Sequence, residues 1–226
     1  MTYYSHIIPV ILFIGVNKRR IKMLINVKEY LIDTLPEEYD KLLQLPDVQI
    51  DSDKIKCIMI NEVPPINPDD GFYGNSADPD YMKTTRELFR AVGIPVNNIS
   101  EILDMGIYIT TAVKIPKQQY TVPKELINQH LPILEKEIEL FPNIKVVMLM
   151  GDVAKTAFNE IAKRKTSKRV IPSGSTYKIR GLQFYYGQVR VFPSYIMTGG
   201  NILIEKSKRN MISEDIKEMM KVLQSL

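Results

Sequence analysis

Four side chains in this sequence have the types and positions needed to bind a flat ligand and act on it. Asn61 and Glu62 follow directly after a short apolar run, and Phe72 and Tyr73 come ten residues after them. A carboxylate can orient a water molecule, while an aromatic ring can stack on a planar group. This stretch therefore predicts a ligand pocket with one acid and an aromatic wall.

The elements that would position these side chains alternate between strands and helices. Four apolar or β-branched segments predict strands: Lys54–Ile60, Ile107–Val113, Val146–Met150 and Val189–Phe192. Four segments with apolar residues at helical spacing predict helices: Tyr81–Val92, Pro123–Leu140, 152–162 and Ser213–Leu226. This alternation is typical of an α/β protein with a mostly parallel sheet and helices on both faces.

Three of the predicted strands end in residues that could form a site. Asn61-Glu62 follow the first strand, Thr110-Thr111 lie in the second, and Phe192-Pro193-Ser194 end the fourth. The carboxyl ends of parallel strands meet at one edge of a sheet, where open α/β proteins bind their ligands. The loop Pro64–Asp80 follows the first of these ends and is long enough to be functional. We therefore expect the site at this edge.

The remaining segments have weaker patterns. Pro36 interrupts the helical spacing of Val27–Leu45 and predicts two helices there. Lys163–Gly174 is expected to be a basic loop, and the alternation of Tyr177–Ile179 and Gln183–Tyr186 predicts a hairpin.

The length and charge of the chain indicate one domain with an N-terminal extension. The chain has 226 residues with 30 basic and 26 acidic side chains, and four basic residues within 1–22 account for the whole excess. We assign residues 27–226 to a single domain and 1–26 to an extension, which is either loosely packed or the product of a start upstream of Met23. Because the rest of the chain is neutral, a polyanionic partner must meet a local basic patch.

Such a patch is predicted in residues 161–204, which contain eight basic and no acidic side chains. The absence of acid fits contact with a phosphate backbone, and a solvated basic loop is the alternative. The basic residues are Lys163, Arg164, Lys165, Lys168, Arg169, Lys178, Arg180 and Arg190.

Several classes of protein are excluded or disfavoured by composition. The single cysteine, Cys57, excludes an intramolecular disulfide and a thiolate cage for a metal or an iron–sulfur cluster. No apolar run reaches the roughly 18 residues that span a bilayer, and no nucleotide-binding glycine motif follows a strand. We expect a cytoplasmic protein, a monomer, with no cofactor, no metal and no membrane partner.

Six segments, in order, resemble the motifs of the uracil-DNA glycosylase superfamily. The resemblance is to the branch whose first motif reads G-E-A-P-G, and it covers roughly Ile55–Leu226. The segments are NEVPP (Asn61–Pro65), GFYG (Gly71–Gly74), GIYITTAVKIP (Gly106–Pro116), FPNIKVVMLMGDVAKTAF (Phe141–Phe158), IRG (Ile179–Gly181) and VFPSYIMT (Val191–Thr198).

This resemblance implies a three-layer α/β/α sandwich around a four-stranded parallel sheet. It implies an enzyme that binds damaged or single-stranded DNA, flips one base into a pocket and cleaves its N-glycosyl bond. Glu62 matches the acid of the first motif, with Asn61 beside it, and Phe72 matches the aromatic that stacks on the base, with Tyr73 as the second candidate. Ser194 and Tyr195 match positions that contact phosphate or flank them, and Ile196 and Met197 lie where a wedge enters the base stack.

Departures from the family pattern leave three functions open. Thr111 stands where the branch has a base-reading asparagine, and it offers one hydroxyl instead of an amide. Phe192 stands where a histidine stabilises the departing base, and losing such a donor typically lowers the rate by about 10²–10³. Thr198 replaces an arginine, and the four cluster cysteines are absent, so we expect no iron–sulfur cluster. The protein is therefore a weak or differently specific glycosylase, a nucleic-acid-binding module without catalysis, or a nucleobase pocket or scaffold.

Overall fold

A five-stranded central sheet organises the fold. A computed structural model describes residues 24–35, 43–199, 202 and 205–225. The strands β3 (Cys57–Asn61), β4 (Ile107–Thr111), β5 (Val146–Met150) and β7 (Val189–Ser194) are parallel, and β6 (Phe184–Tyr186) is antiparallel to β7. The order is β4-β3-β5-β7-β6. The four expected strands are confirmed, and the fifth is an antiparallel edge strand, so four was an undercount.

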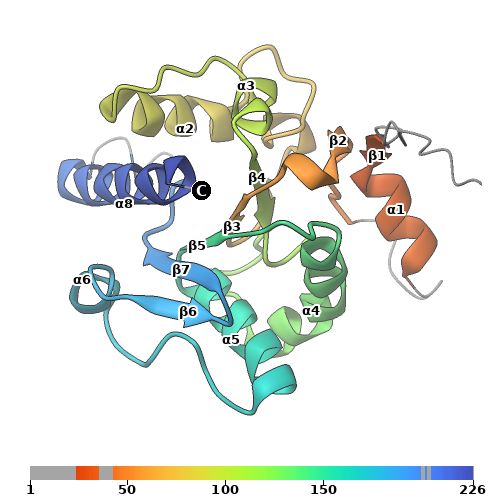
Figure 1. The fold of residues 1–226 in the computed structure, drawn as a ribbon. Helices are drawn as coiled ribbons and strands as arrows, with labels where there is room; N and C mark the ends of the chain where they lie inside the picture. The colour runs from red at the N-terminus through yellow and green to blue at the C-terminus, as the bar shows by residue number, and fades with distance from the viewer. Residues whose placement is uncertain (1–23, 36–42, 200–201, 203–204, 226) are drawn as a thin grey trace, which may run out of the picture.

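Helices cover both faces of this sheet and make three layers (Figure 1). The helices α1 (Val27–Thr34), α4 (Lys124–Glu139) and α5 (Asp152–Thr166) contribute to one apolar cluster with Ile58 and Ile60 of β3. The helices α2 (Asp80–Ala91), α3 (Ile99–Asp104) and α8 (Lys206–Gln224) contribute to another with Cys57 and Met59. Successive residues of a strand point to opposite faces, so β3 is buried throughout and is apolar up to Ile60, with the polar Asn61 at its end. The predicted α/β/α sandwich is confirmed.

Two helices are longer than their apolar patterns indicated. α8 begins at Lys206, so Ser213 is a buried residue inside the helix and not near its cap. Its first turn is polar and exposed, and hydrophobic periodicity cannot detect such a turn. α5 continues to Thr166, so Lys163–Lys165 are helical and the expected loop there was wrong. Lysine and arginine favour helices, and Ser167 ends this one in the left-handed conformation.

The predicted hairpin was placed one element too early. Thr176–Ile179 form a single helical turn, α6, and the hairpin joins β6 to β7 through Gly187 at φ +60°. Alternation over three residues cannot distinguish a strand from one turn of helix. Here the turn is set by tertiary contacts, because Ile179 packs in the core and the Thr176 hydroxyl accepts a hydrogen bond from Lys155 Nζ (2.7 Å).

Other elements had no clear signal in the sequence. A two-stranded antiparallel sheet joins β1 (Leu24–Asn26) to β2 (Gln49–Asp51), and single 3-10 turns occur at Ser52–Lys54 and Pro68–Asp70. α1 ends at Thr34, before Pro36 as expected. The second helix expected before Leu45 falls mostly on residues 36–42, and the extension on residues 1–23, which lie outside the described residues.

Candidate functional site

The residues singled out at the strand ends do lie along one edge of the sheet. Thr111 at the end of β4 pairs in register with Asn61 at the end of β3, and Met150 of β5 pairs with Ser194 of β7. β3 and β5 pair up to Ile60 and Leu149, so these residues form one row across four strands. They face the side of the sheet covered by α2 and α8, as the burial of Met59 and Met150 in that cluster shows.

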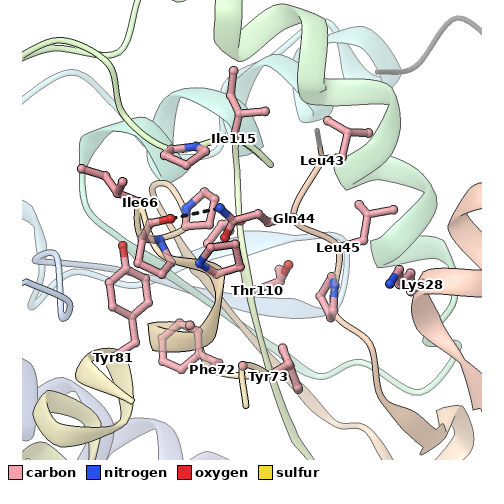
Figure 2. A pocket seen from close by; sticks show the side chains of 18 of the residues that line it. Lys28, Leu43, Gln44, Leu45, Ile66, Phe72, Tyr73, Tyr81, Thr110 and Ile115 are labelled. Carbon is pink, nitrogen blue, oxygen red and sulfur yellow. Dashed lines mark hydrogen bonds between the residues drawn. The ribbon is translucent and has the colours of Figure 1, made fainter. Parts of the chain in front are cut away.

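A cavity of about 680 Å³ opens beside the β4 end of this row (Figure 2). The loop after β3 forms one wall with Phe72 and Tyr73, segment 43–46 forms another, and Ile115, Pro116 and Gln118 form a third. Tyr81 of α2 and both threonines of β4 also line it. The cavity thus joins Phe72, Tyr73 and Thr111, three of the four base-site positions that the family resemblance indicates, and leaves out Phe192. Its size suits a planar ring system.

Phe72 is held in the cavity wall by its loop and by α2. Its ring is nearly buried and meets the Tyr81 ring edge-on, with centroids 5.3 Å apart. A methyl group at Gly74 would lie 2.3 Å from the carbonyl oxygen of Asp69, so only glycine fits this turn of the loop. The Tyr81 hydroxyl donates to the carbonyl oxygen of Val63 (3.0 Å) and fixes the other end of the loop. The Phe72 ring is therefore held in one position in the cavity wall.

Tyr73 has a structural role in this conformation. Its hydroxyl donates to the backbone oxygen of Ile109 on the edge strand β4 (2.8 Å), and its ring stacks on Tyr108 with centroids 6.0 Å apart. Burial raises the pKa of this hydroxyl well above its usual value, so it stays protonated as a donor. Tyr73 thus covers the edge strand beside the cavity, and its ring packs toward the interior.

Gln44 crosses the cavity, and no pattern in the sequence predicted this. Its backbone nitrogen donates to the carbonyl oxygen of Lys114 (2.7 Å), and its Nε2 donates to the carbonyl oxygen of Pro65 (3.1 Å), the dashed line in Figure 2. The side chain ties the segment before β2 to the loop that carries Phe72. Gln44 stands between two leucines in an apolar stretch, so only the tertiary structure places it here.

Glu62 lies at the same edge but turns away from this cavity. Its Oε1 accepts a hydrogen bond from the backbone nitrogen of Val153 (3.2 Å) in the first turn of α5. Gly151 leaves the room, since a methyl group there would lie 2.3 Å from Oε1 and its φ is +109°. Burial raises the pKa of Glu62, and hydrogen bonds from the backbone of Val153 and Asp152 oppose this rise. The carboxyl group of Glu62 therefore caps the first turn of α5.

Asn61 is the least satisfied polar residue at the edge. It is fully buried, and among the described residues neither its Oδ1 nor its Nδ2 has a hydrogen-bond partner. Buried amide groups are almost always paired in native proteins. Its position beside Thr111, a residue that lines the cavity, makes it a candidate for contact with a ligand.

A buried ionic network supports the β4 end of the site from the opposite face. Lys114 and Glu137 form a fully buried ion pair, and Lys114 Nζ also donates to Thr110 Oγ1 (2.8 Å) and to the Thr111 carbonyl oxygen (2.7 Å). Glu137 in turn accepts from the Tyr108 hydroxyl (2.5 Å) and Thr110 Oγ1 (2.7 Å). Burial lowers the pKa of Lys114, and the charge of Glu137 opposes this. The network fixes both threonines of the strand end.

Phe192 and Ser194 face α8 and lie apart from the cavity. Phe192 is nearly buried with the Arg190 guanidinium 4.5 Å above its ring, and it lines a second cavity of about 620 Å³ with residues of α8. The Ser194 hydroxyl is buried and donates to Asp215 Oδ2 (2.6 Å), so it is not available to a phosphate in this conformation. Burial raises the pKa of Asp215 to about 6, although Ser194 and Arg180 oppose the shift.

The basic residues are not gathered at the site. Lys163, Arg164 and Lys165 occupy the last turn of α5, whereas Glu62 caps its first turn, about 16 Å away along the axis. Lys165 also pairs with Glu135 (2.9 Å) and Glu139 (3.2 Å). Lys168 and Arg169 are exposed in the segment that follows.

Three further residues of the last motif lie near the strand ends. Met197 is fully buried in the cluster under α2 and α8, and Tyr195 is half-buried against it. Thr198 is nearly buried and hydrogen-bonds with the Tyr81 hydroxyl, so this segment closes over the strand ends. In this conformation Met197 is part of the core and does not project as a wedge.

Comparison with known proteins adds no assignment. No protein-family model matches the chain, and no curated protein matches it significantly. Within the described residues no group of three or more His, Cys, Asp or Glu side chains could hold a metal ion. No helix in that part of the chain has the length and apolar character to cross a membrane. The candidate function must therefore be argued from the strand-end residues.

Proposed function

We propose that this protein is a uracil-DNA-glycosylase-like enzyme that binds one unstacked base in DNA and hydrolyses its N-glycosyl bond, with a base preference or rate altered from that of the family. The observation that carries the proposal is the cavity of about 680 Å³ at the carboxyl edge of a mostly parallel sheet, walled by Phe72 and Thr111. Base recognition by stacking needs a rigid aromatic wall, and the Phe72 loop provides one.

Glu62 supports the hydrolytic part of the proposal. Its raised pKa brings proton exchange closer to neutral pH, which suits a group that positions and deprotonates a water molecule. Its hydrogen bond to Val153 uses Oε1. In the proposed mechanism the carboxylate also stabilises positive charge on the sugar as the bond to the base breaks.

A second function is favoured by the environment of Phe192. This residue cannot donate a hydrogen bond to a departing base, and it lies beneath Arg190 outside the Phe72 cavity. A protein with these properties would bind a base or a nucleic acid without cleaving it. The two functions make different predictions for the same oligonucleotides.

The test uses the full chain with single-stranded and duplex oligonucleotides that carry one uracil, hypoxanthine, xanthine or alkylated adenine. Abasic sites are revealed by alkaline cleavage after incubation with stoichiometric protein. We expect product on at least one substrate, and a loss of about 10²-fold or more with Glu62→Gln. Glu218→Gln, a change at an exposed residue of α8, is the matched control and should retain the activity.

The results distinguish the glycosylase from the binding module. Binding without any abasic product identifies the binding module, and its log K should then fall linearly with log salt concentration. No binding to any oligonucleotide at low salt rejects both functions.

A further inference from the structure

The unpartnered amide of Asn61 is a costly feature of the core. Its side chain is fully buried, yet neither polar atom has a hydrogen-bond partner among the described residues. These are also the only buried side-chain nitrogen or oxygen atoms in that part of the chain without a partner. A buried donor and acceptor without partners destabilise a protein, whereas an apolar side chain of the same size would not.

The position of Asn61 relates this amide to the cavity. Residues of β3 alternate between faces, so Asn61 shares the α2 and α8 side with Met59 and Cys57. On that side its neighbour in register is Thr111, and Thr111 lines the cavity together with Phe72. Adjacent strands are about 4.8 Å apart, so the amide lies one strand beyond the inner wall.

The chemistry of an amide defines what it would recognise. Asparagine offers an acceptor oxygen beside a donor nitrogen, and this pair matches a base edge that presents a donor beside an acceptor. Asn61 does not itself line the cavity, and a planar ligand between Phe72 and Thr111 would have its far edge about one strand spacing from this amide. The Thr111 hydroxyl alone offers only one group at this place.

We infer that Asn61 reads the Watson–Crick edge of the bound base, and that it supplies from β3 the paired hydrogen bonds that Thr111 on β4 cannot make. The inference rests on the proposed base-binding function and names the ligand class: bases with an adjacent donor and acceptor. Bases methylated on that edge lose the donor and are excluded. The amide is thus retained for recognition at the expense of stability.

The test combines binding and stability measurements on the full-length chain. The probe is an oligonucleotide in which one central nucleotide carries a base and all others are tetrahydrofuran abasic analogues. Central deoxyuridine is compared with N3-methyldeoxyuridine, and deoxyinosine with 1-methyldeoxyinosine. We expect the wild type to prefer the unmethylated member of a pair by roughly 10- to 100-fold, and Asn61→Leu to reduce that ratio to about one.

The stability arm asks whether Asn61 has a structural role instead. Because leucine removes the unpaired amide, Asn61→Leu without ligand should raise the melting temperature by about 2–4 °C. Asn128→Leu, at an exposed position of α4, is the matched control and should change neither the ratio nor the stability appreciably. A lower melting temperature for Asn61→Leu would show that the amide stabilises the fold and would overturn the inference.

The binding outcomes distinguish this inference from the function on which it rests. If the wild type binds the probes but Asn61→Leu keeps the same preference, the inference fails and base binding survives. If the wild type binds none of the probes, base binding fails and the reading of Asn61 fails with it.

Discussion

Removing the charge of Glu137 should strongly destabilise the protein. In Glu137→Gln the side chain keeps its shape and one oxygen for Tyr108 and Thr110, but Lys114 loses its only buried anionic partner among the described residues. Lys114 Nζ would then retain two neutral acceptors, the hydroxyl of Thr110 and the carbonyl of Thr111. The ammonium group has no solvent exposure with which to compensate.

The size of the effect follows from this geometry. Breaking a fully buried ion pair by removing one charge typically costs about 3–5 kcal/mol. For a chain of this length that corresponds to a fall in melting temperature of roughly 6–20 °C. By contrast, Glu139→Gln removes a carboxylate whose pairs with Lys136 (3.3 Å) and Lys165 (3.2 Å) are largely exposed, so it should cost less than about 1 kcal/mol.

The pH dependence of the stability of Glu137→Gln tests whether the unpaired charge of Lys114 causes the loss. Burial already lowers the pKa of Lys114, and Glu137→Gln removes the charge that opposes this, so the folded-state pKa falls further below the unfolded value. Between those two pKa values the unfolded chain binds more protons, so the unfolding free energy of the variant rises with pH. The penalty should therefore be largest near pH 7 and should shrink as the pH approaches 10.

Urea denaturation of the wild type and both variants at pH 7 and pH 10 measures these differences. Adding Lys114→Met to Glu137→Gln should recover most of the loss, because the unpaired charge is then absent. The reasoning is refuted if Glu137→Gln lies within 1 kcal/mol of the wild type at pH 7, or if its penalty is the same at pH 10.

Two further predictions concern the loop and the α8 face. Gly74→Ala should lower the unfolding free energy by roughly 2–4 kcal/mol in urea titrations, because the added methyl group overlaps the Asp69 carbonyl. Gly181→Ala is the control, since a methyl group there meets nothing within 4 Å. Equal losses in the two variants would contradict the argument. Asp215 has a pKa of about 6 in the folded protein against 3.8 in the unfolded chain, so the unfolded chain loses its proton first as the pH rises. The unfolding free energy of the wild type relative to Asp215→Asn should therefore fall by up to about 3 kcal/mol between pH 4 and pH 6. A difference that stays flat or rises would contradict the effect of burial.

The sheet was largely predictable because its strands are short apolar runs buried on both faces. Val146–Met150 has the predicted bounds, and Ile107–Thr111 and Cys57–Asn61 lie within two or three residues of the predicted ends. β6 was assigned to a hairpin but not to the central sheet, since three residues with one half-exposed face have no distinct period. The predicted ends of α2 and α4 lie within one residue of those in the structure, whereas α5 and α8 were predicted too short because their polar last and first turns carry no apolar signal.

Some features of the site could likewise be predicted from the sequence, and others could not. The strand-end rule brought Asn61, Thr111 and Ser194 to one edge, since parallel strands that follow helices must start and finish together. The strand-end rule does not predict the direction in which each side chain points. Glu62 bonds to α5, Ser194 bonds to Asp215, and the basic cluster of α5 lies at the far end of that helix.

The sequence by itself determined the layers, the order of strands and helices along the chain, and the edge at which polar residues meet, because hydrophobic periodicity and chain direction are local properties. Only the tertiary structure decided that Gln44 crosses the cavity, that Lys114 pairs with Glu137 beneath β4, and that the amide of Asn61 is left without a partner. These features depend on which groups from distant segments come within hydrogen-bonding distance, and no local pattern encodes that distance.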